Sequence, residues 1–388
     1  MSTIAPSRPR TSTTVTAAMT VQVAAVLPLF LFGGLAVQIT GELGMGVTAI
    51  GWISGIYFAV SALTTVPSGR LVDRFGALVT ARIAIAMSAA GLLGIAFIAH
   101  DPLVLTAFMV LCAPANGLGQ LASNTVLSEW APQGRRSLLF GAKQASVPLC
   151  TMLGGLSVPV VALTLGWRWA FVIGAGLVLL ALIPLAGLGR PAVREKNKSA
   201  RSFDLQLLLF AVATFLGSLA ATPIGSFATT YTVDIGGSER YAGLVLMVGG
   251  IAGVIGRTGF GALADFRKGG EFTIIALMLT TGAAGLATYL FELPWLLPFG
   301  TAAAYGLGWA WPGLMNHAVV SRYADAPALA TSVTQTGIFL GGAVGPICFG
   351  LLVEHSGWGT GWTAAVASMA ASALFIVAGS MVGKRLPH

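Results

Sequence analysis

The chain has 388 residues, of which 56% are hydrophobic and only 9% are charged. Soluble globular domains are typically about one-quarter charged, so this composition excludes an ordinary soluble protein and predicts a polytopic membrane protein. The formal net charge is +8, but the basic residues follow a membrane topology, described below, and we expect no nucleic-acid partner. The three cysteines lie far apart in apolar segments without metal-ligand spacing, so we expect neither a metal nor a cofactor.

Apolar runs of about 20 residues recur along the chain, and each is long enough to cross a hydrocarbon core of ~30 Å. Residues 1–14, which precede them, are rich in Ser, Thr, Pro and Arg and predict a disordered cytoplasmic N-terminus. The first run extends well past a signal-peptide core, so we interpret it as a retained helix. Twelve transmembrane helices are predicted, at 15–39, 47–68, 77–98, 102–127, 137–164, 168–188, 205–230, 240–262, 272–291, 295–318, 328–353 and 359–382.

A charged segment near the middle of the chain, 189–204, is the longest connection and predicts a cytoplasmic linker. It separates an N-terminal six-helix half, 15–188, from a C-terminal six-helix half, 205–383, which a cytoplasmic tail, 384–388, follows. An offset of 191 residues aligns Gln144 with Gln335 and Gly166-Trp167 with Gly357-Trp358, and an offset of 192 aligns "GRLVD" with "GALAD". Two parallel six-helix repeats are typical of one class of secondary transporters.

The basic residues favour one side of this predicted topology. With the N-terminus in the cytoplasm, 19 of the 21 Lys and Arg residues fall on the cytoplasmic side, and Arg168 and Arg240 are the exceptions. The acidic residues divide almost evenly, 7 inside and 6 outside. This is the positive-inside pattern, which predicts cytoplasmic N- and C-termini for a multi-pass protein of the cytoplasmic membrane.

The twelve spans, the two repeats and the sequence "GRLVDRFG" between the second and third helices resemble the major facilitator superfamily in its bacterial form. The signature of that family at this position is G-x-L-x-D-R-x-G-R-K/R. It is matched here by Gly69, Leu71, Asp73, Arg74 and Gly76, whereas Ala77 and Leu78 replace the closing basic pair. A weaker copy in the second half comprises Gly261, Leu263, Asp265 and Arg267.

The resemblance covers essentially the whole chain, and it implies an all-α fold in which two halves rock about a central cavity by alternating access. It also implies that Asp73 and its neighbours form a conformational latch, which holds the cytoplasmic side closed in the outward-open state; alternatively, these charges only fix the topology. The predicted latch residues are Gly69, Asp73, Arg74, Gly76, Gly261, Asp265 and Arg267. Ala113 stands where many proton-coupled members have an arginine, and helices 1, 4, 7 and 10 lack a mid-membrane carboxylate. The coupling ion is therefore left open.

The resemblance implies a cavity lined mainly by helices 1, 4, 7 and 10. The polar and aromatic candidates for this lining are Asn116, Gln120, Asn124, Lys143, Gln144, Tyr305, Trp309, Trp311, Asn316, His317 and Gln335. The three amides of helix 4 are four residues apart and share one face, so they either line the cavity or bond neighbouring helices. The aromatic residues of helix 10 form either a wall for a substrate or packing between the halves. His317 either carries a proton or meets the headgroups.

Lys143 is the one charged residue in the apolar run from Ser137 to Leu165. Its side chain either snorkels to the headgroups or faces the bundle interior, where an ionisable residue typically belongs to a substrate path. No carboxylate lies in the same membrane layer apart from Glu129 near the inner surface, so the sequence slightly favours an organic anion as the small-molecule substrate.

An exporter of hydrophobic drugs or metabolites is the alternative function. The antiporter signature of helix 5, G-x-x-x-G-P-x-x-G-G, is matched only loosely, by Pro148 and Gly154-Gly155. A membrane-embedded enzyme and a transport-dead receptor are more remote alternatives, because no metalloprotease, nucleophile-elbow or phosphate-loop motif is present. We expect a monomeric transporter in the lipid bilayer, with no catalytic residues.

Overall fold

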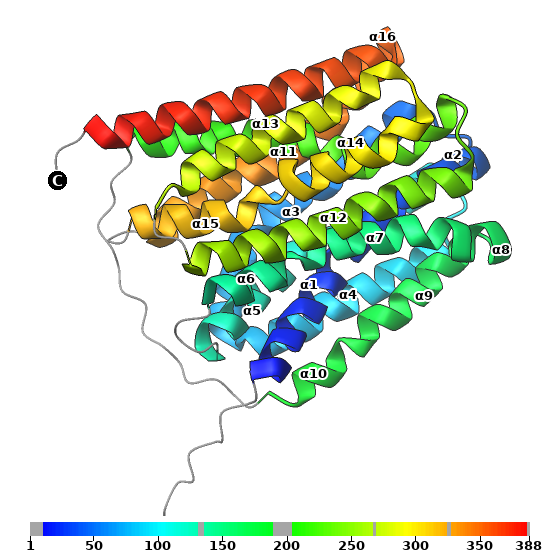
Figure 1. Ribbon diagram of the computed structural model, residues 1–388. Helices are drawn as coiled ribbons and strands as arrows, with labels where there is room; N and C mark the ends of the chain where they lie inside the picture. The colour runs from blue at the N-terminus through cyan, green and yellow to red at the C-terminus, as the bar shows by residue number, and fades with distance from the viewer. Residues whose placement is uncertain (1–10, 131–135, 189–203, 267–268, 324–326, 386–388) are drawn as a thin grey trace, which may run out of the picture.

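The computed structural model describes residues 11–130, 136–188, 204–266, 269–323 and 327–385. Within these ranges every regular element is a helix, which confirms the predicted all-α class. The helices lie side by side, and α1 begins at the same end of the bundle at which α16 ends (Figure 1). We call this the termini end, and the other end the opposite end.

The N-terminal half runs from α1 to α10. Its helices are α1 (Thr11–Gly34), α2 (Ala36–Leu43), α3 (Val47–Phe75), α4 (Ala77–Phe97), α5 (Pro102–Trp130), α6 (Arg136–Gln144), α7 (Ser146–Ser157), η1 (Val158–Ala162), α8 (Leu163–Leu165), α9 (Trp167–Leu180) and α10 (Leu182–Ala186). α1 begins within the segment predicted to be disordered, because a helix can extend beyond the apolar stretch from which a span is predicted.

The C-terminal half runs from α11 to α16. Its helices are α11 (Leu205–Asp234), α12 (Glu239–Phe266), α13 (Glu271–Ala287), η2 (Thr288–Phe291), η3 (Pro294–Leu296), α14 (Leu297–Ala303), η4 (Ala304–Gly308), α15 (Trp311–Arg322) and α16 (Pro327–Arg385). The predicted linker, 189–204, lies outside the described residues apart from Asp204, which caps α11 by accepting a hydrogen bond from the Leu207 amide.

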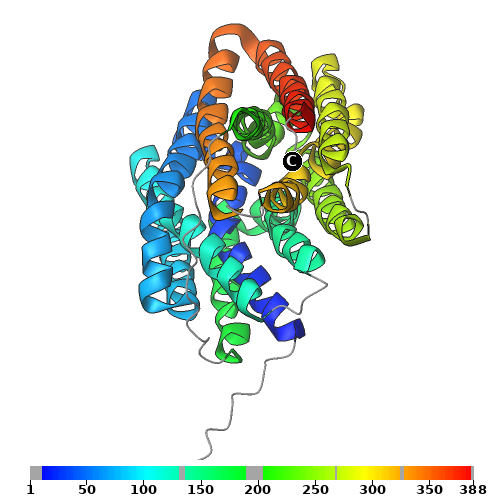
Figure 2. The same ribbon diagram turned by 90° about the vertical axis from the view of Figure 1, so that its left-hand side faces the viewer.

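Ten helices in the described part of the chain are long and apolar enough to cross a membrane. The twelve predicted spans differ from these ten in two places. α16 contains Gly357 in a non-helical conformation, with φ 80° and ψ 169°, where two helices join at an angle (Figure 2). The segment from η3 to α15 is divided into short helices, so it counts as no single span. These two places would supply the further crossings, and twelve remains a prediction.

The repeat seen in the sequence recurs in the backbone and in side-chain contacts. Gly166 and Gly357, which the 191-residue offset aligns, adopt φ 95° and 80°, a region that favours glycine. The indole of Trp167 donates to the Glu42 carboxylate at 2.6 Å, and that of Trp358 donates to the Asp234 carboxylate at 2.7 Å. Because offsets of 191 and 192 residues relate these two pairs, the halves are structurally equivalent at this turn.

Glycines bring the two halves into close contact at equivalent positions. A Cβ on Gly155 of α7 would lie 2.5 Å from the Gly243 carbonyl oxygen of α12. The equivalent contact joins Gly51 of α3 to Pro346 of α16, where a Cβ would overlap the Pro346 carbonyl. Small residues allow helix backbones to approach closely in a membrane. Two helix pairs, α7 with α12 and α3 with α16, therefore pack the halves together.

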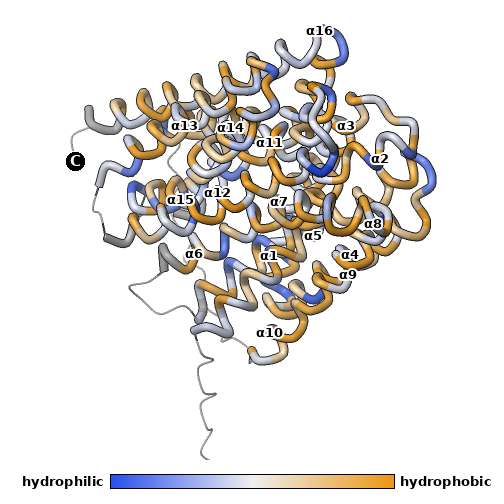
Figure 3. The backbone as a smooth tube through the Cα atoms, turned by 45° about the vertical axis from the view of Figure 1, so that its right-hand side comes forward, coloured by the Kyte–Doolittle hydropathy of each residue, from blue (hydrophilic) through white to orange (hydrophobic). Residues whose placement is uncertain are grey.

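Hydrophobic residues dominate the lengths of the helices (Figure 3). Large apolar side chains such as Leu63 and Leu103 are 78% and 79% exposed. An exposed apolar patch of this kind is unfavourable in water but suits contact with lipid tails. Among the described residues, few charged side chains lie inside the bundle.

Candidate functional site

Lys143 lies inside the bundle, with no exposed surface. Its ammonium donates to Oε1 of Gln120 at 2.8 Å and to Oδ1 of Asn124 at 3.0 Å. Both acceptors belong to α5, where their four-residue spacing places them on one face. The structure thus brings together three of the predicted site residues, and the ammonium is not at the bundle surface.

Arg257 is a second buried cation, 6% exposed, and it comes from α12 in the C-terminal half. Its Nη1 donates to the Gln144 carbonyl oxygen at 2.8 Å, while Nε and Nη2 donate to the Trp309 carbonyl oxygen at 3.3 and 3.0 Å. The guanidinium also lies over the Trp309 ring, 5.8 Å from its centroid. One guanidinium therefore links α6 of the N-terminal half to the segment before α15.

The Gln144 carbonyl is available to Arg257 because of the local sequence. A regular helix would use this carbonyl to accept the amide hydrogen of residue 148, but that residue is proline and has no amide hydrogen. The helix is broken at Ala145, between α6 and α7. A backbone acceptor thus remains at the interface between the halves, and a buried acceptor requires a partner.

Lys143 and Arg257 carry charges that no carboxylate balances within the part of the chain that the structure describes. The acceptors of both cations are neutral amide or backbone oxygens. The two residues lie in the same part of the bundle, because Gln144, the sequence neighbour of Lys143, bonds to Arg257 through its carbonyl. A buried charge without an opposite charge is costly, so the pair favours the entry of an anion.

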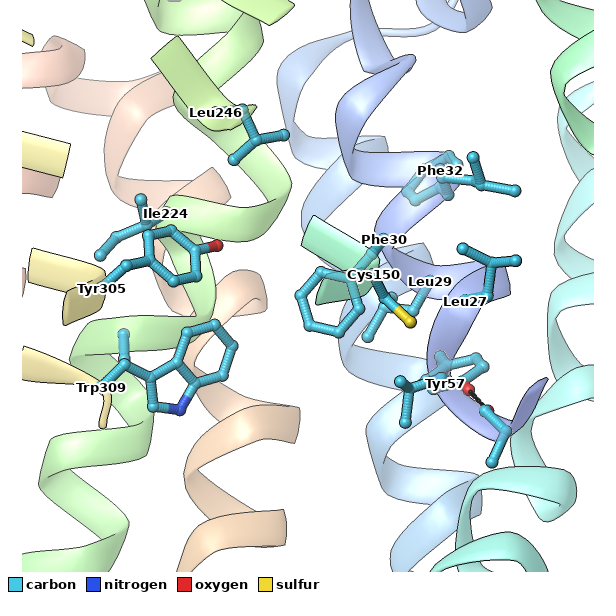
Figure 4. Close-up of a cluster of buried hydrophobic side chains, with 14 of the residues drawn as sticks. Leu27, Leu29, Phe30, Phe32, Tyr57, Cys150, Ile224, Leu246, Tyr305 and Trp309 are labelled. Carbon is cyan, nitrogen blue, oxygen red and sulfur yellow. Dashed lines mark hydrogen bonds between the residues drawn. The ribbon is translucent and has the colours of Figure 1, made fainter. Parts of the chain in front are cut away.

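An aromatic layer borders this charged pair. Trp309 packs against Phe30 across the halves at 6.2 Å between ring centroids, and against Tyr305 at 5.3 Å (Figure 4). Between Phe30, Gly225 and Trp309 is a cavity with room for about one water molecule. The Tyr305 hydroxyl points toward the other half and, among the described residues, finds no hydrogen-bond partner.

Between this cavity and the opposite end of the bundle, the two halves are in close contact. A Cβ on Gly33 of α1 would overlap the Gly225 carbonyl of α11. The Thr229 hydroxyl donates to the Gly33 carbonyl at 2.9 Å, and the hydroxyls of Ser226 and Ser54 are 3.0 Å apart. These contacts pack α1 and α3 tightly against α11.

The remaining predicted site residues do not join one cluster. Asn116 bonds to Ser61 at 3.4 Å, within the N-terminal half. Trp311 packs against Gly217 inside the C-terminal half, because residues two apart on a helix point to different faces and Trp309 faces Phe30. The half-buried residues of this group are Asn316, His317 and Gln335. The aromatic wall therefore consists of Tyr305 and Trp309 without Trp311.

The predicted latch residues lie at the turn between α3 and α4 and near the end of α12. Gly76 adopts φ 83° and joins the two helices without a loop, a conformation that favours glycine. Asp73 and Arg74 are exposed near the end of α3, whereas Gly261 faces Gly141 of α6. The side chain of Asp265 and all of Arg267 lie outside the described residues.

Arg257 was not among the predicted site residues, because the positive-inside pattern assigned it to the cytoplasmic membrane surface. A signal was present, since Arg257 lies inside the predicted span 240–262, five residues before its end. An arginine within a span is unusual and typically faces the bundle interior. The same argument that selected Lys143 would have selected Arg257.

Comparisons with known proteins agree with this fold. The profile of the Major Facilitator Superfamily matches residues 18–346. A "Putative tartrate transporter" of Agrobacterium vitis is 25% identical over 84% of this chain and 83% of its own. The "Multidrug efflux pump Tap" of Mycobacterium tuberculosis strain H37Rv is 26% identical over 93% of each chain. A solved bacterial homologue of the human lysosomal transporter Spinster shares the fold, with a TM-score of 0.70 at 16% identity, over 95% of this chain and 97% of its own.

Proposed function

Because the chain belongs to the Major Facilitator Superfamily, it is a membrane transporter of small solutes and not an enzyme, and we propose that its substrate is an organic anion, moved by secondary active transport. The observation that carries this proposal is the buried pair Lys143 and Arg257, whose charges meet only neutral oxygens within the described residues. An anion between the halves would compensate both charges.

The named relatives support two substrate classes. One carries the name of a tartrate transporter, and tartrate is an organic anion. Others carry the names of efflux pumps, including an "MFS-type efflux pump" of Mycolicibacterium smegmatis that is 28% identical over 84% of this chain. Export of hydrophobic compounds is therefore the second candidate, and the aromatic layer of Phe30, Tyr305 and Trp309 favours it. The buried cations favour the anion.

The proposal includes a topology and a mechanical cycle. The termini end faces the cytoplasm, the chain crosses the cytoplasmic membrane twelve times, and the transporter is a monomer. The substrate passes between the halves, from Lys143 to the cavity at Trp309, as the two halves rock. His317 on α15 is the candidate to carry a coupling proton.

The predicted latch at Asp73 has its own test. Asp73→Asn should impair transport without preventing membrane insertion, and wild-type transport kinetics in this variant would count against the latch.

Substitution of Lys143 tests the proposed substrate class. In proteoliposomes, Lys143→Gln should raise the KM for the anion about ten- to a hundredfold, because one charge-assisted contact is worth about 1.5–3 kcal/mol. Lys143→Arg should rescue only partly, since a planar guanidinium does not replace an ammonium. Arg168→Gln, which removes a cation at the opposite end, is the control. A neutral compound as best substrate, with unchanged kinetics in Lys143→Gln, would support the exporter instead.

A further inference from the structure

The two carbonyls that Arg257 binds come from different halves of the molecule. Gln144 ends α6, and Trp309 follows η4 in the segment before α15. We call the guanidinium of Arg257 with these two carbonyls the Arg257 clasp. Its bond to Gln144 crosses the interface beside the close approach of Gly141 to the Arg257 carbonyl, where a Cβ would lie 3.1 Å away.

The Arg257 clasp gives the guanidinium hydrogen-bond acceptors but no negative charge to balance its own. A guanidinium has five N–H donors, and three nitrogens of Arg257 donate to only two carbonyl oxygens. An ammonium has three donors, and the bonds of Lys143 go to two amide oxygens. Both side chains therefore retain donor capacity in a buried site.

Lys143 and Arg257 lie in the same part of the bundle. Lys143 is adjacent in sequence to Gln144, whose carbonyl lies 2.8 Å from Nη1 of Arg257. Both basic side chains are buried, so two groups of like charge lie in the same part of the bundle. A singly charged ligand would balance only one of them. A carboxylate accepts two parallel hydrogen bonds from a guanidinium, and it binds the guanidinium more strongly than a backbone carbonyl does.

We propose that Lys143 and Arg257 form one site for a small organic anion with two carboxylates, and that one carboxylate takes Arg257 away from the Gln144 carbonyl. This inference rests on the proposed transport of organic anions and adds the charge of the substrate and the residue that selects it. Since Gln144 and Arg257 belong to different halves, binding of the dianion breaks a bond between the halves. Substrate binding is thereby linked to the separation of α6 from α12.

The test compares compounds of similar size that differ in charge. Uptake into proteoliposomes is measured at pH 7 for four-carbon dicarboxylates and for their monoamides, because both carboxylates of the former are then ionised. The wild type should prefer the dicarboxylate at least about tenfold in kcat/KM. Arg257→Gln and Lys143→Gln should each lower dicarboxylate transport about ten- to a hundredfold and monoamide transport much less, so that the preference disappears. Arg168→Gln should retain it.

The possible results separate this inference from the proposed function. Equal transport of monoamides and dicarboxylates by the wild type, or an equal loss of both in Arg257→Gln, overturns the dianion site while organic-anion transport stands. Transport of neither class of anion, with transport of neutral compounds, overturns the proposed function itself. If Arg257→Gln does not fold, Arg257→Lys is used instead, because it keeps the charge without the planar guanidinium. Arg257→Lys should keep part of the preference for dicarboxylates. If it keeps the whole preference with wild-type kinetics, the role of the Arg257 clasp is overturned.

Discussion

Nη1 of Arg257 lies 2.8 Å from the carbonyl oxygen of Gln144, and this bond joins the two halves of the transporter at a break in a helix. The break has a local cause, because Pro148 cannot donate an amide hydrogen to the carbonyl four residues before it. A proline in one half thus supplies the acceptor for an arginine in the other. The strength of this contact depends on competition for a single carbonyl.

Pro148→Ala tests this competition. The new amide hydrogen at position 148 could bond to the Gln144 carbonyl within a regular helix, which would weaken its bond to Arg257. If an anion must displace this carbonyl, the variant should bind the anion a few-fold more tightly than the wild type. The measurement is the anion's Kd by calorimetry on purified protein. Pro114→Ala, in α5, provides the control, because it restores an amide hydrogen away from Arg257. Weaker binding in Pro148→Ala than in Pro114→Ala would contradict the competition.

The sequence was sufficient for the fold class, the repeat and part of the site. Long apolar runs leave no alternative to helices in a membrane, because only internally bonded backbones can cross it. The amides of helix 4 and Lys143 were selected as polar groups within apolar segments, and the structure places Gln120 and Asn124 against the ammonium. The 191-residue offset aligned Trp167 with Trp358, which make equivalent hydrogen bonds.

Other features depended on contacts that no local pattern contains. The partner of Arg257 is a backbone carbonyl 113 residues away, and backbone groups are invisible in a list of polar side chains. Trp309 and Trp311 were predicted to form one stripe, but residues two apart on a helix point to different faces, so the second ring packs against Gly217.

Gly33→Ala should prevent the closed arrangement at the opposite end. The added methyl group would overlap the Gly225 carbonyl of the other half, and backbone atoms cannot yield as a flexible side chain does. We expect transport to be lost and thiol reagents to label a cysteine at Ser54 more readily than in the parent. Gly41→Ala is the matched control, because a Cβ there meets nothing within 4 Å. Normal transport by Gly33→Ala would show that this contact is not required in the cycle.

Glu42 should make the stability of the opposite end sensitive to acid. Burial alone would raise the pKa of its carboxyl, but hydrogen bonds from Arg168 and Trp167 and the charge of Arg168 outweigh burial and hold the pKa below its usual value. A lowered pKa in the folded state means that the stabilisation is present at neutral pH and is lost as the pH falls through that pKa. The pair is partly exposed, so its contribution is about 1 kcal/mol or less.

The measurement for Glu42 is thermal unfolding in detergent at pH 7 and between pH 5 and 3. At pH 7 the wild type should unfold at a higher temperature than Glu42→Gln, and the difference should shrink as the pH decreases. Asp234→Asn, at the equivalent position of the second half, is the comparison, since Asp234 accepts from Trp358. A difference between wild type and Glu42→Gln that stays constant over this range would contradict the assignment.

Tyr305→Phe should change stability and substrate affinity in opposite directions. The Tyr305 hydroxyl is buried and, among the described residues, has no hydrogen-bond partner, so its removal relieves an unsatisfied polar group and should raise the unfolding free energy by up to about 1 kcal/mol. If the hydroxyl bonds to substrate in the path beside Trp309, the same variant should raise KM about five- to tenfold. Tyr289→Phe separates the two effects, because the Tyr289 hydroxyl already bonds to Thr301 at 2.6 Å; its removal should lower stability and leave KM unchanged. A Tyr305→Phe variant with wild-type KM would place the hydroxyl outside the substrate path, whatever its stability.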